Sequence, residues 1–154
     1  MGYEMRRADR KISESEAKQL LLSGSYGVLS MTGSGGKPYG VPVFYLYRNG
    51  RLYFHGAKEG RKAAHLQENR NASFCVVGQM QVLPAHFSAR YESVIAEGEV
   101  YIAEGEEKEA ALHGFIEKYS PEFLEKGAAY IQAAKEKTCV FGMTVTVLSG
   151  KARR

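Results

Sequence analysis

The dipeptide Asn49-Gly50 constrains the fold of this chain more than any other pair of neighbouring residues. It separates two runs rich in aromatic and β-branched residues, Tyr39–Tyr47 and Leu52–His55. Asn-Gly between two such runs is a strong short-range signal for a β-hairpin, because both residues tolerate the positive φ angles of a tight turn. Together with the compact run Tyr26–Met31 before it, the hairpin predicts a three-stranded antiparallel meander.

Three further strands are expected after this meander, at Ala72–Gly78, Ala89–Ile102 and Cys139–Gly150. Gly98, in the middle of the long second run, indicates a bulge or a sharp bend of the kind that small barrels need at their corners. The segment Gln79–Ala85 contains a proline and is predicted to be less regular. The last four residues, KARR, are predicted to be frayed.

Helical patterns surround these strands. Ser13 followed by Glu16 is a capping-box signature for the start of a helix. A short helix is expected over Arg61–Asn69, and two more are expected over Glu104–Tyr119 and after Pro121. About six strands in meander order, three or four helices and no βαβ alternation predict a mainly β protein, a small antiparallel β-barrel with flanking helices.

Composition sets outer limits on the function. The length of 154 residues predicts a single domain over residues 1–154. The net charge of +4 suits a phosphate-bearing ligand as well as nucleic acid, so it does not distinguish between these two kinds of ligand. No apolar run approaches the length of a membrane span, and the N-terminal segment lacks the apolar centre of a signal peptide. Cys75 and Cys139 lie in apolar runs, as buried thiols in a reducing compartment do, so we expect a cytoplasmic location away from membranes.

Several self-contained catalytic motifs are absent from the sequence. Gly36-Lys37 is followed by Pro38, where a phosphate-binding Walker loop needs Ser or Thr. The run at residues 33–35 lacks the third glycine of a dinucleotide fingerprint, and no G-x-S-x-G nucleophile elbow occurs. The histidines and cysteines show no recurring metal-ligand spacing, so no metal site is predicted. The chain therefore offers a place to bind a group that brings its own chemistry.

The adjacent cations Arg61 and Lys62 are the main candidate for such a place. They follow a short turn, residues 57–60, and begin a predicted helix, whose first turn already carries partial positive charge. Repulsion there becomes attraction when an anion lies between the side chains and the exposed backbone N–H groups. The pattern predicts a phosphate site between a strand end and a helix start. The alternative is a solvated Arg-Lys pair without a ligand, which is common in loops.

Several segments of the chain resemble one known family, the pyridoxamine 5′-phosphate oxidase-like split-barrel flavoproteins, and within it the 5-nitroimidazole-resistance proteins. The resemblance is carried by Met5–Arg10, Gly40–Tyr45, Leu52–Lys62, Tyr91–Ile95 with the Gly98 bend, and the paired helices before the last strand. The segment LYFHGAKEGRK around His55 is the most specific of these. The resemblance implies an FMN-binding split barrel in which FMN lies in a groove between the two subunits of a homodimer.

The resemblance also implies the residues of the site. Arg61 and Lys62 would hold the phosphate, and the backbone of two segments would flank the flavin. These segments are Val41, Pro42, Val43 and Phe44 in one strand and Tyr53, Phe54, His55, Gly56 and Ala57 in the next. The oxidases proper carry a serine before the Arg-Lys pair, where this chain has Gly60, so one phosphate hydrogen bond is either lost or supplied by a backbone N–H. Ser93 is a further cofactor-binding candidate, unless it only faces its neighbouring strand.

His55 is the candidate catalytic residue, expected to orient the acceptor or to tune the flavin; the alternative is that it only packs at the barrel rim. The expected function is an FMN-dependent oxidoreductase of the nitroimidazole-reductase type, in which NAD(P)H reduces the flavin and a small aromatic or nitro substrate accepts the electrons. The residues that bind pyridoxal phosphate in the oxidases have no convincing counterpart, so that activity is not expected. Two other interpretations stay open: a split barrel that binds haem or a deazaflavin, and an OB-like binder of single-stranded nucleic acid.

Overall fold

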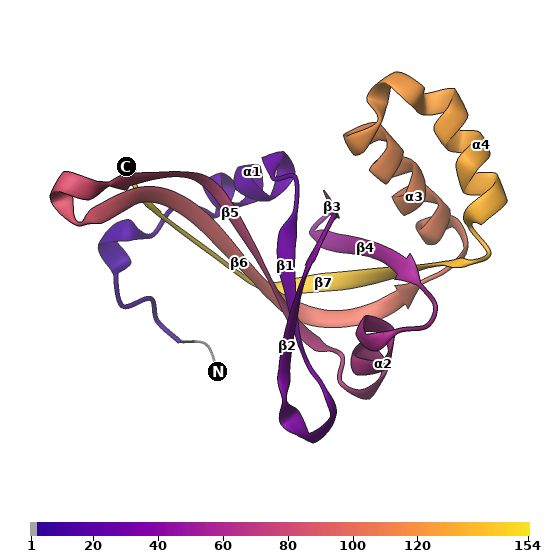
Figure 1. Ribbon diagram of the computed structural model, residues 1–154, viewed down its shortest axis with the longest axis horizontal. Coiled ribbons are helices and arrows are strands. Elements are labelled where there is room, and N and C mark those ends of the chain that lie inside the picture. The colour runs from indigo at the N-terminus through magenta and orange to yellow at the C-terminus, as the bar shows by residue number, and fades with distance from the viewer. Residues whose placement is uncertain (1–2) are drawn as a thin grey trace.

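The computed structural model describes residues 3–154, so the first two residues of the predicted 1–154 domain lie outside it. Figure 1 shows the described chain. Its strands are β1 (Gly27–Thr32), β2 (Pro38–Val43), β3 (Leu46–Arg48), β4 (Arg51–Ala57), β5 (Asn71–Leu83), β6 (Ser88–Ala103) and β7 (Thr138–Arg153). Its α-helices are α1 (Glu14–Ser23), α2 (Arg61–Glu68), α3 (Gly105–Tyr119) and α4 (Leu124–Ala134). None of these helices is both long and apolar enough to cross a membrane.

The order of the strands explains how the sheet becomes a barrel. Within residues 3–154 the seven strands form one antiparallel sheet in the order β2-β1-β5-β6-β7-β4-β3. The two edge strands, β2 and β3, are neighbours in sequence, joined only by Phe44 and Tyr45. Because two residues span only about 7 Å when extended, the sheet must curl until its opposite edges meet. The result is a split barrel flanked by helices, which confirms the predicted fold class.

The predicted strand Tyr39–Tyr47 is two strands, so the prediction of a three-stranded meander is wrong. Its first half, β2, pairs with β1, and its second half, β3, pairs with β4 at the other edge of the sheet. Sequence periodicity could not reveal this, because both halves alternate in the same way while their partners differ. The hairpin itself is confirmed: Asn49 and Gly50 have φ angles of 54° and 73°, as a type I′ turn requires.

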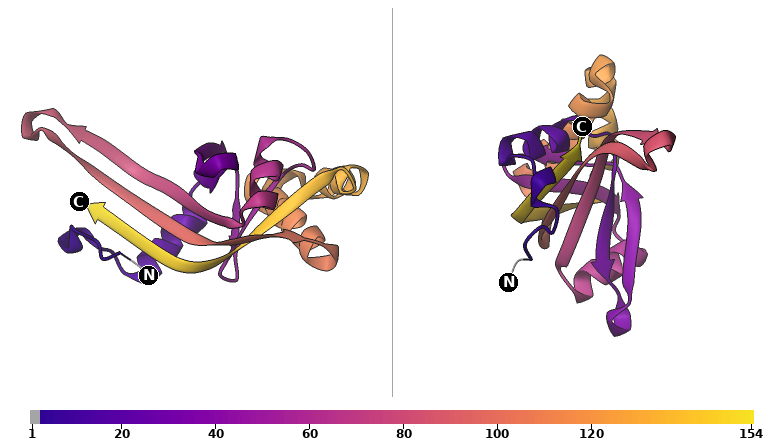
Figure 2. Two further views of the ribbon diagram at one scale, coloured as in Figure 1. Left: turned by 90° about the horizontal axis from the view of Figure 1, so that it is seen from below. Right: turned by 90° about the vertical axis from the view of Figure 1, so that its left-hand side faces the viewer.

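Two other strands continue beyond their predicted ends. Strand β5 continues to Leu83 and pairs with the start of β6, so the segment predicted to be irregular belongs largely to a long hairpin. We call residues 78–90 the β5–β6 arm; Figure 2 shows it extending beyond the end of β7. Most of the tail predicted to be frayed, Lys151–Arg153, also pairs with β6, which holds it in the sheet. The bulge at Gly98 is confirmed by a register shift there, and a Cβ at Gly98 would collide with the backbone oxygen of Thr144.

The core consists of two clusters on opposite sides of β4. The first fills the barrel and includes the fully buried rings of Phe54 and Phe74. Helix α1, which begins with the predicted capping box, closes one end of this cluster with Leu20 and Leu21. The second cluster lies between β4 and α3, where Tyr53 packs among apolar side chains of the helix. Each fully buried aromatic or leucine side chain contributes about 1.5–3 kcal/mol to folding. Helix α3 is therefore fixed firmly against β4, on the side opposite the barrel interior.

Candidate functional site at the split of the barrel

The hydrogen-bonded ladder between β3 and β4 ends early and leaves two strand edges unpaired. Its last pair is Leu46 with Tyr53. Continuing the same register would bring Phe44 opposite His55, but within residues 3–154 no backbone hydrogen bond joins residues 39–44 to residues 54–57. The other edge of β4 is fully paired with β7. We call these two unpaired edges the split. Backbone N–H and C=O groups along them are free to bind a ligand.

The end of the split away from the Leu46–Tyr53 pair is closed by the start of α2. Gly60 precedes this helix with φ 126° and ψ 178°, a conformation that is essentially restricted to glycine. No side chain among residues 3–154 caps the helix, and its first intrahelical bond runs from the Ala64 N–H to the Gly60 oxygen. The N–H groups of residues 61–63 therefore have no intrahelical acceptor. A serine in place of Gly60 would be strained in this conformation. The polar groups at this helix start are therefore backbone N–H donors.

Arg61 is held in place by aromatic neighbours. Its guanidinium carbon lies 3.9 Å from the centroid of the Tyr39 ring, and its Nε donates a hydrogen bond of 3.1 Å to His65 Nε2. The ring of His65 packs edge-on against Tyr39 and touches Gly33, where a Cβ would lie 2.7 Å from its Cε1. Arg61 thus links α2 to β2.

Lys62 lies across the end of β4. Its Nζ donates to the His55 carbonyl oxygen at 3.3 Å and occupies the space above Gly56, where a Cβ would come within 2.9 Å of it. Burial lowers the pKa of the Lys62 ammonium. A half-buried cation that has only a neutral carbonyl as its acceptor is stabilised by a nearby anion. Together with Arg61 and the N–H groups of α2, Lys62 can hold a phosphate.

His55 points away from Lys62, toward α3. Part of its side chain is exposed, but its ring meets the ring of Phe115 edge-on, with centroids 4.6 Å apart. The partial burial lowers the pKa of the His55 imidazole, and the charge of Lys62 lowers it further. Both effects favour the neutral imidazole, which can both donate and accept a hydrogen bond.

Aromatic side chains continue from His55 to Phe44. The ring of Phe115 is parallel to that of Tyr119, one helical turn further along α3, with centroids 6.3 Å apart. Tyr119 in turn lies 5.0 Å from the ring of Phe44, which is 60% exposed. We call His55, Phe115, Tyr119 and Phe44 the aromatic row. It crosses the split from His55, whose carbonyl oxygen accepts from Lys62 Nζ, to Phe44, and suits a flat, apolar ligand.

Tyr45 fixes the corner at which the two edges meet. Its N–H donates to the Tyr119 hydroxyl at 3.1 Å, its carbonyl accepts from Lys118 Nζ at 2.9 Å, and its own hydroxyl donates to the Leu21 carbonyl at 2.6 Å. The Lys118 ammonium also lies 3.7 Å from the Tyr45 ring centroid, and burial lowers the pKa of Lys118 to about 8. Helices α1 and α3 thus both hold the corner.

The structure brings most of the predicted site residues to the split, but several only through their backbone. Val41 and Val43 pack toward the core, and Pro42 is exposed. Phe54 is fully buried, and the Tyr53 hydroxyl is occupied by Glu107 at 2.8 Å. The residues nearest the predicted phosphate end are Gly56, Ala57, Arg61 and Lys62, beside His55.

Ser93 is the exception. Arg61 lies over Tyr39, and the strand register across β1 and β5 places Tyr39 level with Gly98 of β6. Ser93 is five residues further along β6, which corresponds to about 17 Å. One chain therefore does not bring Ser93 to the Arg61-Lys62 end of the split. Its side chain faces outward, beside Val77 of β5 and Lys151 of β7.

Sequence reasoning missed the residues that position the site. Tyr39, Phe115, Lys118 and Tyr119 had no assigned role, although a helix was predicted over Glu104–Tyr119. Their contacts with Arg61, His55 and the corner join residues that are far apart in the sequence, so no local sequence pattern predicts them. Among residues 3–154 no group of three or more His, Cys, Asp or Glu side chains could hold a metal ion.

The depressed pKa of His55 gives a pH-dependent prediction. We expect His55 to titrate below its ordinary value of 6.5, since burial and Lys62 both disfavour the charged form. Because the unfolded chain then binds the proton more tightly, this contribution to stability is present above pH 6.5 and is lost as the pH falls through the folded-state pKa. The titration is measured by NMR of the imidazole protons.

Two variants separate the causes of this shift. Phe115→Leu should raise the pKa of His55 more than Lys62→Met does, because burial is the larger cause. The variant His55→Gln should lose less stability than wild type between pH 7 and pH 5. A His55 that titrates at or above 6.5 in the wild type would contradict the packing described for its ring.

Comparisons with known proteins show which family and which solved structures this chain resembles. Residues 13–152 match the family model described as pyridoxamine 5′-phosphate oxidase. No curated protein matches the sequence. Among solved structures, a candidate 5-nitroimidazole antibiotic resistance protein from Bacteroides thetaiotaomicron is 25% identical with a TM-score of 0.75, over 92% of this chain and 86% of that one.

Two further solved structures share the fold. An FAD-binding protein from Mesorhizobium loti is 21% identical with a TM-score of 0.67, over 94% of this chain and 98% of that one. The flavocytochrome Anf3 from Azotobacter vinelandii is 21% identical with a TM-score of 0.80, over 99% of this chain and 73% of that one. An OB-type barrel has five strands, which the seven-stranded order of this sheet does not match. The match over residues 13–152, together with this fold, shows that the chain belongs to the pyridoxamine 5′-phosphate oxidase family.

Proposed function

We propose that this protein binds FMN along the split and acts as a flavin-dependent oxidoreductase that reduces a small aromatic or nitro-aromatic acceptor. One observation carries the proposal: the unpaired edges of β2 and β4 run from an aromatic row to a cationic helix start. A flat ring system with a phosphate at its far end matches this arrangement, because its ring suits the aromatic row and its phosphate suits the cationic helix start. NAD(P)H is the proposed electron donor.

The phosphate end of the ligand is matched by Arg61, Lys62 and the uncapped N–H groups of α2. Charge-assisted hydrogen bonds are worth about 1.5–3 kcal/mol each, so the two side chains could supply a large part of the roughly 8 kcal/mol of a micromolar complex. The pair suits a single phosphate ester, which favours FMN over FAD. The five-residue distance along β2 from Tyr39 to Phe44 is about 17 Å, enough for an extended mononucleotide.

The ring end of the ligand is matched by backbone groups and by the aromatic row. The unpaired edge of β4 from Phe54 to Ala57 offers hydrogen bonds to the polar rim of a flavin. A bound flavin would supply one- or two-electron transfer. Phe44 and Tyr119 offer a surface on which a planar acceptor stacks, and the neutral His55 orients it by a hydrogen bond. The similarity to the Bacteroides protein supports a nitro-aromatic acceptor.

The function is tested by loading the protein with FMN and following its spectrum and its turnover. We expect a flavin absorption spectrum, release of FMN on heating, and NAD(P)H-dependent reduction of a 5-nitroimidazole. The variant His55→Ala should keep FMN but reduce the nitroimidazole at least tenfold more slowly, since one orienting hydrogen bond of about 1.5 kcal/mol is lost.

The matched control is His113→Ala, because His113 lies on α3 outside the aromatic row. It should leave both FMN binding and turnover within twofold of wild type. A haem Soret band in place of the flavin spectrum, or a protein that fails to bind FMN, would overturn the proposed function. Unchanged turnover in His55→Ala would show that His55 only packs against its neighbours.

We further propose that the protein is a homodimer in which each split is completed by the partner. Ser93 faces outward on β6, too far from Arg61 in its own chain, and can join the site only from a second copy. The same outer face exposes Val28, Val77, Ile95 and Val147 on four neighbouring strands. A stripe of exposed apolar side chains on a sheet face is typical of a surface that is covered by a partner.

The dimer is tested by placing charge in this stripe. The double variant Val77→Arg/Ile95→Arg should convert a dimer into a monomer of 17.1 kDa, measured by light scattering, and weaken FMN binding at least tenfold. The control Leu124→Arg changes an equally exposed side chain on α4 and should stay dimeric. A wild-type monomer that binds FMN tightly would contradict the shared site.

A further inference from the structure

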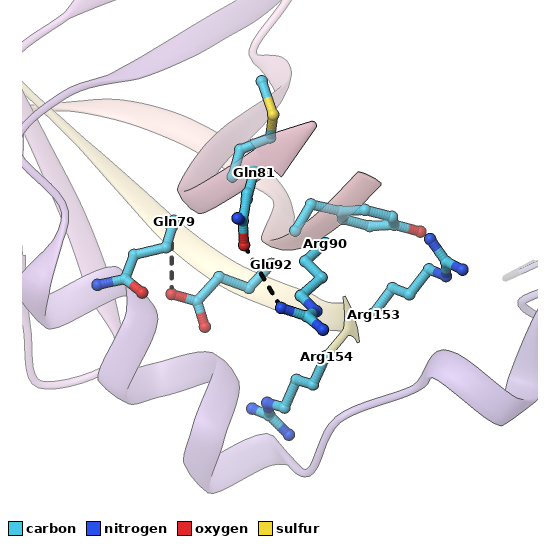
Figure 3. Close-up of a pocket in the computed structure, with 8 residues that line it drawn as sticks. Gln79, Gln81, Arg90, Glu92, Arg153 and Arg154 are labelled. Atoms are coloured by element: carbon cyan, nitrogen blue, oxygen red, sulfur yellow. Dashed lines mark hydrogen bonds between the residues drawn. The ribbon is translucent and has the colours of Figure 1, made fainter. Parts of the chain in front are cut away.

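Cationic side chains gather around one concavity of the surface without forming a separate site. This concavity of about 680 Å³ lies between the β5–β6 arm and the end of β7, and Figure 3 shows Arg90, Arg153 and Arg154 around it. Successive side chains of a strand point to opposite faces, so Arg90 and Tyr91 do not face the same ligand. Tyr91 shares its face with Ser93, and the proposed dimer covers that face. A polar group that neither the dimer nor the fold accounts for lies elsewhere, on α2.

This group is the Nδ1 atom of His65. It is buried, and it has no hydrogen-bond partner within residues 3–154. The ring occupies a tight space, because it packs edge-on against Tyr39, and a Cβ on Gly33 would lie 3.0 Å from Nδ1. A buried polar group without a partner lowers stability, so its presence needs an explanation other than stability.

The contact with Arg61 determines where the proton of His65 lies. Arg61 Nε carries a hydrogen at every accessible pH and donates it to His65 Nε2 over 3.1 Å. His65 Nε2 must therefore present its lone pair. In a neutral imidazole one nitrogen accepts and the other carries the proton, so the proton of His65 lies on Nδ1. The bond to Arg61 is thus made with the proton on the nitrogen that has no acceptor.

His65 is the middle member of a row of side chains on α2. Arg61, His65 and Glu68 occupy positions i, i+4 and i+7, which lie on one side of a helix. At one end of the row the guanidinium of Arg61 lies over Tyr39. At the other end Glu68 accepts hydrogen bonds of 2.9 Å and 3.2 Å from the Ser34 hydroxyl, in the connection between β1 and β2. The imidazole is therefore held by its surroundings and not by Arg61 alone.

The use of Nε for His65 leaves the terminal nitrogens of Arg61 for a ligand. A guanidinium has five N–H donors, one on Nε and four on the two Nη atoms. Within residues 3–154 the Nη atoms of Arg61 have no hydrogen-bond acceptor. A planar fork of this kind matches the oxygens of a phosphate.

We propose that His65 is a positioning residue of the phosphate site: its Nε2 lone pair holds Arg61 Nε, so that the Nη atoms of Arg61 face the phosphate. This inference rests on the proposed binding of FMN along the split. The contact with Tyr39 alone leaves the guanidinium free to turn over the ring, and the bond to His65 gives it a second fixed point. Because Arg61 is oriented before the ligand arrives, less side-chain freedom is lost on binding. The unpaired Nδ1–H is the loss of stability that accompanies this orientation.

The tautomer of His65 is tested on the protein without ligand, so this test does not depend on the flavin. Long-range ¹H–¹⁵N correlation NMR at about pH 8, where imidazole is neutral, distinguishes a protonated ring nitrogen from an unprotonated one. We expect the proton of His65 on Nδ1 in the wild type. In Arg61→Met the proton should move to Nε2, because no donor then holds the Nε2 lone pair.

The role of His65 in binding is tested by comparing the affinities of FMN and riboflavin, which differ only in the phosphate. His65→Leu keeps an apolar side chain against Tyr39 but removes the acceptor. It should reduce the preference for FMN at least about fivefold, leave riboflavin affinity unchanged and not lower the melting temperature, because the unpaired donor is gone. His65→Gln should keep the preference within twofold, since glutamine Oε1, like histidine Nε2, is three bonds from Cβ and can accept from Arg61.

A double-mutant cycle shows whether His65 acts through Arg61. In the Arg61→Met background, His65→Leu should change the preference for FMN less than twofold. The control Gln67→Leu changes an exposed polar side chain of the same helix and should have no such effect in either background.

Three results would overturn the inference: a wild-type proton on Nε2, an unchanged preference in His65→Leu, or an equal loss in both backgrounds. A wild type that binds neither flavin, but whose His65 proton lies on Nδ1 and moves in Arg61→Met, would overturn the proposed function and uphold the positioning of Arg61 by His65.

Discussion

Closure of the sheet at Tyr45 is the constraint on which the rest of the structure depends. The two edge strands lie at opposite ends of a seven-stranded order, yet only Phe44 and Tyr45 connect them. At such a corner the backbone cannot pair with a strand on either side, so its polar groups need other partners. Tyr119 and Lys118 supply them for the Tyr45 backbone, and the Tyr45 hydroxyl donates to the Leu21 carbonyl. Buried hydrogen bonds of this kind contribute about 1 kcal/mol each, and leaving them unmade costs more.

Fixing the corner in this way also creates the split. Because the β3–β4 ladder stops at Leu46 and Tyr53, the following residues diverge and leave unpaired edges. Arg61, stacked on Tyr39, closes the other end. The two ends differ in chemistry: one is cationic and rich in N–H donors, and the other is aromatic. A barrel that closed completely would pair these edges with each other and have no backbone groups left for a ligand.

Local patterns in the sequence predicted most of the elements but not their partners. The capping box at Ser13, the Asn49-Gly50 turn and the Gly98 bulge depend on residues close in sequence, and all three are confirmed. The division of Tyr39–Tyr47 into two strands depends on which edge each half meets, and periodicity carries no information about that.

The same limit applies to the site. The Arg61-Lys62 pair could be singled out because adjacent cations at a helix start conflict with the helix dipole. The roles of Tyr39, Phe115 and Tyr119 could not, since an aromatic residue in an apolar pattern looks the same whether it fills a core or supports a functional side chain. Ser93 was predicted as a residue that reaches a ligand or only faces its neighbouring strand, and its distance from Arg61 became visible only in the folded chain.

The central claim is that the cationic end of the split recognises the phosphate of a flavin mononucleotide. The most direct test compares the affinities of FMN and riboflavin, which differ only in that phosphate, for the wild type and for Arg61→Gln/Lys62→Gln. With two charge-assisted bonds, the wild type should prefer FMN by at least about a hundredfold. In the double variant the preference should fall to a few-fold, with riboflavin affinity unchanged and with Lys58→Gln behaving as wild type. A double variant that keeps the wild-type preference for FMN would contradict the account.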